Sequence, residues 1–268
     1  MIDTAQQLKL LRQRIAARNA SDEYIGDLQY VAITQTSNVF NLDFYGRCCD
    51  ESYEDFLDTI ARSDVAPLLR SIVIRGPDEG ANGTRNWDIE PLLATGVTFT
   101  NLEKFSIQLN QPGDHNRIII GSIDEEDGVL ARLIEKTPRI QELTVPSAPS
   151  AAFFNIGKRP IRFLSVDSGY DTQDFIANFA KSSCFPDLQR LEWGEYQETY
   201  LEDYLDNCTQ AADYQKLFKS NAFASVGFFL WRNPVCTSED IRSLKALKPN
   251  LQFLVVHYSD YFVWVRAA

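Results

Sequence analysis

Histidine, the residue type that most often serves as a catalytic base or a zinc ligand, is rare in this chain of 268 residues. Only His115 and His257 are present, so any Ser–His–Asp or Cys–His arrangement must use one of these two. The sequence contains neither a G-x-S-x-G elbow nor an H-E-x-x-H segment. It therefore predicts neither an elbow-type serine nucleophile nor a histidine-bound zinc site.

The cysteines also lack a pattern that carries chemistry. Their number is odd, none forms a C-x-x-C pair, and none has metal-site spacing. We expect buried or free thiols in a reducing compartment. The N-terminal residues lack the basic and apolar regions of a signal peptide, and no apolar run approaches the length of about 18 residues needed for a membrane span. A cytoplasmic protein is expected. The cysteines are Cys48, Cys49, Cys184, Cys208 and Cys236.

Carboxylates are plentiful, and the formal net charge is −11. This balance argues against binding to nucleic-acid phosphates, which requires clustered basic residues. It permits a basic protein partner, although an acidic surface can also serve solubility alone. The acidic run 124–127 lacks the ordered spacing of a calcium loop and suits a helix N-terminus instead. We expect no metal and no cofactor.

A recurring apolar pattern indicates the elements that must position any site. Leu102, Phe105 and Ile107 precede Asn110, which matches the L-x-x-L-x-L-x-x-N core of a short strand followed by a helical return. Similar triads recur at a mean interval of about 30 residues from Leu69 onward. In chain order the other triads are Val39/Leu42/Phe44, Leu69/Ile72/Ile74, Ile140/Leu143/Val145, Ile161/Leu164/Val166, Leu188/Leu191/Trp193, Phe223/Val226/Phe228 and Leu251/Leu254/Val256.

The strand segments 140–145, 188–193 and 251–256 resemble those of the leucine-rich repeat superfamily, in its irregular bacterial cytosolic branch. This resemblance implies an α/β fold: a right-handed, ribonuclease-inhibitor-like horseshoe with a parallel sheet on its concave face and helices on its convex face. It also implies that the chain binds another protein. The closing Asn is present only at Asn110, so the repeats are degenerate.

The repeats define the expected organisation of one structural domain. Residues 1–37 form an N-terminal helical and hairpin cap, residues 38–258 the irregular repeats, and residues 259–268 a closing segment. A helix over 4–18 capped by Thr4 is expected to cover the open end of the solenoid, or alternatively to bind a partner. Return helices are expected over 51–62, 88–95, 122–135, 171–181, 213–219 and 238–247. Residues 76–83 and 111–116 are expected to be loops, and prolines leave an extended or 3₁₀ return over 146–160.

Residues between the triad positions are expected on the concave face, because side chains alternate along a strand. At the C-terminal end this assignment exposes Phe229, Phe253 and Val255 as an apolar patch suited to a protein interface. The alternative is that residues 258–265 fold over them. The assigned residues are Asn41, Asp43, Tyr45, Ser71, Val73, Arg75, Lys104, Ser106, Gln108, Glu142, Thr144, Phe163, Ser165, Asp167, Arg190, Glu192, Ser225, Gly227, Phe229, Phe253, Val255 and His257.

The segment 195–206 combines five acidic residues with tyrosines at every fourth position and contains no Lys or Arg. Tyrosine supplies contact area and a hydroxyl group, so the segment is a candidate contact surface; the alternative is that the tyrosines pack inward. The predicted partner-binding residues are Glu195, Tyr196, Glu198, Tyr200, Glu202, Asp203, Tyr204, Phe229, Phe253 and His257.

The sequence thus predicts a non-catalytic protein-binding protein. One specific version is an acidic immunity or inhibitor protein for a basic toxin or nuclease. A hydrolase or other enzyme with a carboxylate site is the alternative, because no motif singles out or excludes a pair of acids. A structural module of a larger assembly is a third.

Overall fold

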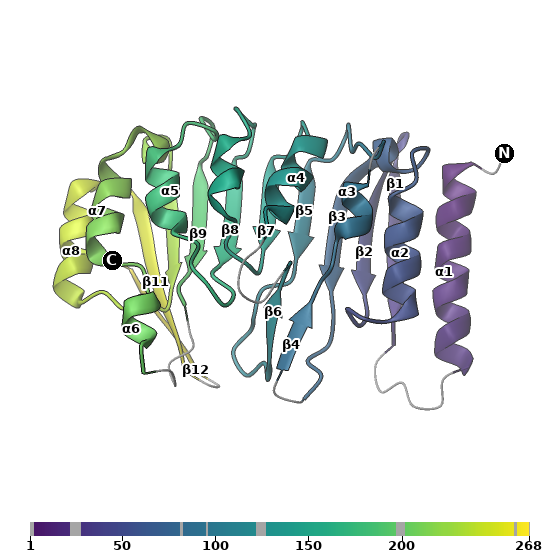
Figure 1. Ribbon diagram of the computed structural model, residues 1–268, viewed down its shortest axis with the longest axis horizontal. Coiled ribbons are helices and arrows are strands. Elements are labelled where there is room, and N and C mark those ends of the chain that lie inside the picture. Colours follow the sequence, from purple (N-terminus) through teal and green to yellow (C-terminus); the bar gives the residue numbers. More distant parts are fainter. Residues whose placement is uncertain are drawn as a thin grey trace.

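A computed structural model describes residues 3–21, 28–80, 83–94, 96–121, 127–196, 202–259 and 262–267. The chain has a mixed α/β fold built on one ten-stranded sheet, with the strand order β1-β2-β3-β5-β7-β8-β9-β10-β11-β12 (Figure 1). Neighbouring strands are parallel, except that β1 pairs with β2 and β11 pairs with β12 in antiparallel fashion. The strands are β1 (Tyr30–Thr36), β2 (Val39–Tyr45), β3 (Leu69–Arg75), β5 (Lys104–Ile107), β7 (Glu142–Val145), β8 (Phe163–Asp167), β9 (Arg190–Gly194), β10 (Phe228–Arg232), β11 (Gln252–Ser259) and β12 (Phe262–Ala267).

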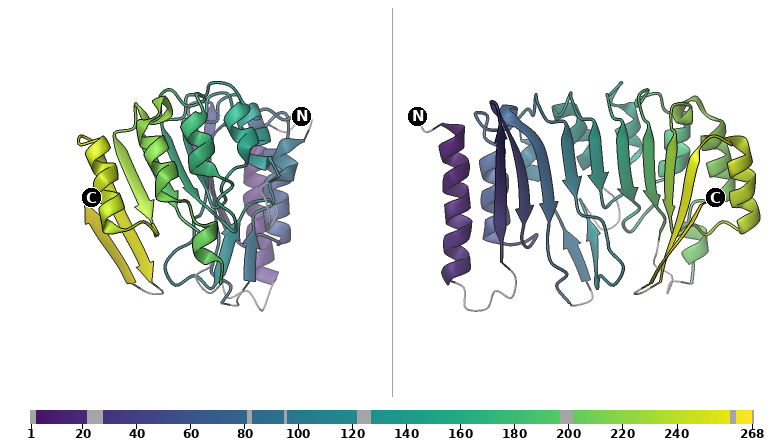
Figure 2. Two further views of the ribbon diagram at one scale, coloured as in Figure 1. Left: turned by 60° about the vertical axis from the view of Figure 1, so that its left-hand side comes forward. Right: turned by 180° about the vertical axis from the view of Figure 1, so that it is seen from behind.

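Helical segments connect the parallel strands and cover one face of the sheet (Figure 1). The reverse view shows the strands in front and the helices behind them, so the described chain leaves the second face uncovered by helices (Figure 2). We call this second face the open face. The helices are α1 (Thr4–Ser21), α2 (Glu51–Ile60), α3 (Glu90–Leu93), α4 (Val129–Lys136), α5 (Phe175–Lys181), α6 (Tyr204–Asn207), α7 (Ala211–Lys219) and α8 (Ser238–Leu247), with 3₁₀ turns η1 (Ala66–Leu68), η2 (Ala151–Asn155) and η3 (Asn221–Phe223).

The core lies between the sheet and the helices, and from β2 to β9 the predicted triads line it, except that Val39 is only half-buried. Leu143, Leu164 and Leu191 are register neighbours on β7, β8 and β9, and none has measurable exposure. The residues between them point to the open face, as alternation requires. The apolar periodicity therefore predicts the buried face correctly over this part of the sheet.

The predicted registers of β10 and β11 are wrong. Phe229 aligns with Leu191 on one side and with Phe253 on the other, so both phenylalanines belong to the core and are at most 2% exposed. Val255 is also buried in the core. Side chains along a strand alternate between the two faces of the sheet with a period of two residues, so an odd shift in register moves each side chain to the opposite face. Phe228, Leu230 and Leu254 take the open-face positions instead and are half-buried.

Helix α1 lies at the β1 end of the sheet, beside α2 (Figure 1). Its Leu8, Leu11 and Ile15 are buried, and Arg18 forms an ion pair with Asp55 of α2. The capping position differs from the prediction. The Asp3 side chain accepts the Gln6 N–H at 2.7 Å, and Thr4 donates its hydroxyl to the Asp64 carbonyl.

Two short strands that the sequence did not predict begin at the last residues of the predicted loops 76–83 and 111–116. β4 (Gly83–Asn86) and β6 (Asn116–Ile119) pair in parallel and form a separate ribbon, drawn below β3 and β5 in Figure 1. The predicted 3₁₀ return is confirmed as η2, and α8 has the expected bounds. The N-terminal part of the predicted helix 122–135 lies outside the described residues, and α4 begins at Val129.

Replacing Leu164 by Ala removes a side chain from the centre of this core. We expect the free energy of unfolding to fall by ~2–5 kcal/mol, as for other large-to-small core substitutions. Thr144→Ala, on the open face of the adjacent strand, is the control and is expected to change it by less than about 0.5 kcal/mol. Urea denaturation measures both values. Equal losses for the two variants would contradict the assignment of the buried face.

Candidate functional site

The loops at the carboxyl ends of β3 and β5 hold the histidine that the sequence singled out. His115 Nδ1 lies 2.6 Å from Asp78 Oδ2, and the His115 backbone N–H donates to Asp78 Oδ1 at 3.1 Å. Burial would raise the pKa of Asp78, but these contacts with His115 outweigh it and lower the pKa. A carboxylate that accepts a proton from Nδ1 leaves Nε2 as the ring's acceptor. The Asp78 carboxylate therefore fixes the orientation of the His115 ring.

This pair lacks the other parts of a catalytic site in the described part of the chain. His115 is half exposed, and its described hydrogen bonds all go to Asp78. No described hydroxyl or thiol completes a nucleophile–base arrangement with it. No group of three His, Cys, Asp or Glu side chains is placed to hold a metal ion among the described residues. The geometry supports a structural role for the pair in fastening two loops.

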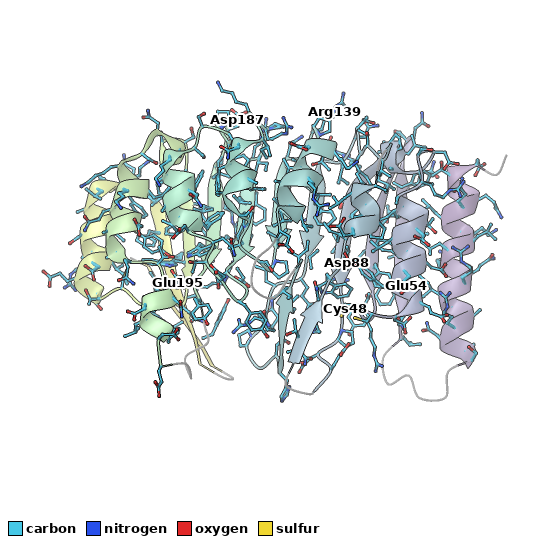
Figure 3. All side chains as sticks on the ribbon, viewed as in Figure 1. Cys48, Glu54, Asp88, Arg139, Asp187 and Glu195 are labelled. Atoms are coloured by element: carbon cyan, nitrogen blue, oxygen red, sulfur yellow. The ribbon has the colours of Figure 1, made fainter. Side chains whose placement is uncertain are left out.

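The five cysteines do not form disulfides in the structure. Cys48 and Cys49 are sequence neighbours whose Sγ atoms lie 3.6 Å apart (Cys48 is labelled in Figure 3). Burial, together with Cys49, raises the pKa of Cys48 to about 12, which disfavours the reactive thiolate.

In the described residues, no helix is long and apolar enough to cross a membrane.

Glu195, predicted to contact a partner, is instead a buried anchor and is 1% exposed (Figure 3). Its carboxylate accepts hydrogen bonds from Tyr214 Oη at 2.5 Å and from Trp193 Nε1 at 3.2 Å. It also accepts from the backbone N–H of Tyr196 and from both the N–H and the hydroxyl of Thr209. Burial raises the pKa of Glu195, and these donors partly oppose the shift. The prediction of a contact role for Glu195 is wrong, because its side chain is buried and its hydrogen bonds fasten the turn after β9 to the core.

The rest of the predicted acidic segment divides between the interior and the surface. Tyr196 is 5% exposed, so its prediction as a contact residue is also wrong. Tyr204 is half-buried and stacks on Tyr196, as the inward-packing alternative requires. Glu202 and Asp203 are exposed. Glu198 and Tyr200 lie outside the described residues, and His257 is a half-buried residue of β11.

A network of charged side chains crosses β8, β9 and β10 on the open face. Arg232 Nε lies 2.9 Å from Asp167 Oδ1, and Arg232 Nη1 lies 3.1 Å from Glu192 Oε2. The Ser165 hydroxyl donates to the same Glu192 oxygen at 3.0 Å. All four side chains are buried, and Arg232 is 5% exposed. We call Ser165, Asp167, Glu192 and Arg232 the ion network.

Glycine at position 194 makes this network possible. β9 lies between β8 and β10, so Asp167 and Arg232 must meet across it. A Cβ atom at Gly194 would stand 1.9 Å from Asp167 Oδ1 and 3.2 Å from Arg232 Nε. The Asp167 carboxylate therefore occupies the space above Gly194 and meets Arg232 there. Burial alone would lower the pKa of Arg232, but the charges of Asp167 and Glu192 outweigh it and raise the pKa.

The ion network holds a second arginine at its exposed side. Arg190 Nε donates to Glu192 Oε1 at 2.8 Å, while its guanidinium carbon lies 4.4 Å from the ring centre of Phe228 and 5.1 Å from that of Phe163. Arg190 is thus clamped between two half-buried rings on the neighbouring strands. We call Phe163, Arg190, Phe228, Leu230 and Leu254 the arginine–aromatic patch.

Sequence reasoning placed Phe163, Arg190 and Glu192 on this face but missed Phe228 and Arg232, because the register of β10 was wrong. Arg232 carried a usable signal: an arginine that ends an otherwise apolar strand must find a partner.

Comparison of the chain with protein-family models, curated proteins and solved structures returns no match.

Replacing Arg232 by Met removes the cation that two buried carboxylates share. We expect the free energy of unfolding to fall by about 3–5 kcal/mol, because Asp167 stays buried without a cation and Glu192 keeps only the half-exposed Arg190. Arg75→Met is the matched control: Arg75 forms an exposed pair with Asp43 on the same face, 2.7 Å apart. Its loss is expected to cost at most about 1 kcal/mol. Chemical denaturation distinguishes the two, and a small effect of Arg232→Met would contradict the network's role.

Glu195→Gln is expected to remove one component of the pH dependence of stability. The native pKa of Glu195 is raised above its ordinary value of 4.5, so the protonated side chain contributes stability below that pH. This contribution is lost as the pH rises through the native pKa. Relative to the variant, the wild-type free energy of unfolding should therefore decline from pH 4.5 upward. Urea titrations of both proteins at several pH values measure this difference, and parallel curves would contradict it.

Proposed function

We propose that this chain is a non-catalytic protein-binding protein whose contact surface is the arginine–aromatic patch on the open face. The observation that carries the proposal is the clamped position of Arg190 between Phe163 and Phe228. Aromatic residues and arginine are enriched at protein interfaces, whereas lysine and acidic residues are depleted. The patch has this composition in a chain whose net charge is −11.

The rigidity of the patch supports binding. A free arginine side chain loses rotamer freedom when a partner immobilises it, at a cost of roughly 0.5–1.5 kcal/mol. Arg190 is already held by Glu192 and by two rings, so much of this cost is met during folding. Leu230 and Leu254 extend the apolar area on β10 and β11. The sheet beneath them is a rigid platform.

The partner that fits best is a protein with a net positive charge, as in the complex of an immunity or inhibitor protein with a basic toxin or nuclease. The charge of −11 would accelerate encounter with such a partner and would make the association rate sensitive to salt. Glu202 and Asp203, which are exposed and follow β9 in the chain, contribute to this negative charge.

We also propose that the fold is a degenerate leucine-rich repeat solenoid of the horseshoe type. In support, the strands of the main sheet follow one another in chain order, and each parallel connection carries helical turns on one face. A binding surface on the strand face agrees with the function that this resemblance implies.

The proposal is tested by affinity capture with the full chain from an extract of the cells that produce it. Phe228→Asp is expected to lose a protein that wild type retains, because the variant places a charge in the apolar part of the patch. Capture at low and high salt, followed by mass spectrometry, measures both the loss and its charge dependence.

Glu239→Ala is the control variant, since Glu239 is exposed on α8, on the helical side. It is expected to retain the protein. If both variants capture the same proteins as wild type, at equal yield and with unchanged unfolding midpoints, the patch is not the contact surface.

A further inference from the structure

The contacts of Arg190 leave one side of its guanidinium group directed away from the ion network. Its Nε and Nη2 atoms both donate to Glu192 Oε1, and none of its described hydrogen bonds uses Nη1. The side chain is 49% exposed, whereas Glu192 beneath it is 12% exposed. A guanidinium has five N–H donors in a fixed plane, so Nη1 and the second N–H of Nη2 form an outward fork.

The charges around this fork are balanced before any partner binds. Arg190 together with Arg232 of the ion network offsets the charges of Asp167 and Glu192. On neighbouring strands of the same face, Lys104 pairs with Glu142 at 3.3 Å. The fork is therefore a local donor site on a neutral area of an acidic protein.

We infer that Arg190 receives a single carboxylate of the partner, presented by a segment whose flanking apolar side chains lie against Phe163, Phe228, Leu230 and Leu254. This inference rests on the proposed function and names the group that the patch recognises. The outward N–H groups match the two oxygens of an Asp, Glu or chain-terminal carboxylate in a bidentate pair. The two rings shield that pair from water, which strengthens it.

Charge complementarity selects this group over its alternatives. A phosphorylated or polyacidic segment would bring several negative charges toward a chain of net charge −11. A basic side chain at the fork would face the guanidinium itself and leave its donors unpaired. One carboxylate within apolar surroundings satisfies the fork at the least electrostatic cost, and the remainder of the partner can still be basic.

The test uses peptides as probes. Random dodecamers displayed on phage are selected on the full-length chain, and enriched sequences are synthesised for measurement of Kd by fluorescence anisotropy. We expect binders that carry one recurrent Asp or Glu beside apolar residues. Replacing that residue by Asn or Gln should weaken binding to wild type at least about tenfold and to Arg190→Gln less than about twofold, as coupling between the two groups requires.

Three further chain variants complete the design, of which Phe228→Ala removes one ring of the arginine–aromatic patch. Arg190→Lys retains the charge but loses the fork and is expected to weaken binding about as much as Arg190→Gln. Arg75→Lys is the matched control on the same face, since Arg75 is likewise paired with a carboxylate, and it should leave the Kd unchanged. Unfolding midpoints report whether each variant keeps its fold.

The outcomes separate this inference from the proposed function. Peptides that require Phe228 but no carboxylate would overturn the inference and leave the contact surface in place. Peptides that are insensitive to Phe228→Ala, or no enrichment at all, would overturn both. Equal binding to Arg190→Lys and wild type would show that charge alone, without the fork, is recognised, and would also overturn the inference.

Discussion

The ten-stranded sheet buries one of its faces beneath the helices, and this constraint fixes where the remaining strand side chains lie. Leu143, Leu164 and Leu191 occupy one continuous row of the core, because parallel strands in register place equivalent residues side by side. Side chains alternate across a strand, so Phe163 and Arg190 must lie on the open face. The burial of one face thus creates the other as a continuous platform.

The ion network is the second determinant of that platform. Burying charges is costly, and a buried pair is tolerated only when its hydrogen-bonding groups are satisfied. Here Arg232 reaches Asp167, Glu192 and the Val166 carbonyl, and Ser165 completes the shell of Glu192. Gly194 is required because the Asp167 carboxylate occupies the space that a side chain at that position would fill. The same Glu192 then orients Arg190, which connects a structural network to the proposed contact patch.

Glu195 shows that an acidic residue in a polar segment can be an interior anchor. It offers acceptors to Trp193, Tyr214 and the chain at Thr209, and none of its described partners is a cation. Five converging donors replace the water that the carboxylate loses. Composition alone indicated a solvated acidic surface, because the donors come from residues up to nineteen positions away. Tertiary structure supplies the most distant donor, Tyr214 of α7, which lies beside Trp231 of β10.

The sequence by itself determined the α/β class, the parallel strands from β2 to β9 and their buried face, because polar residues interrupt the apolar ones and set the phase of the alternation. It could not determine which side chains of β10 face the core, because Phe228, Phe229, Leu230 and Trp231 are all apolar. There the register came from pairing with β9, which places Phe229 and Trp231 beside Leu191 and Trp193. The partner of Arg232 was likewise decided by tertiary structure: Asp167 lies 65 positions away and becomes a neighbour only when β8, β9 and β10 are assembled.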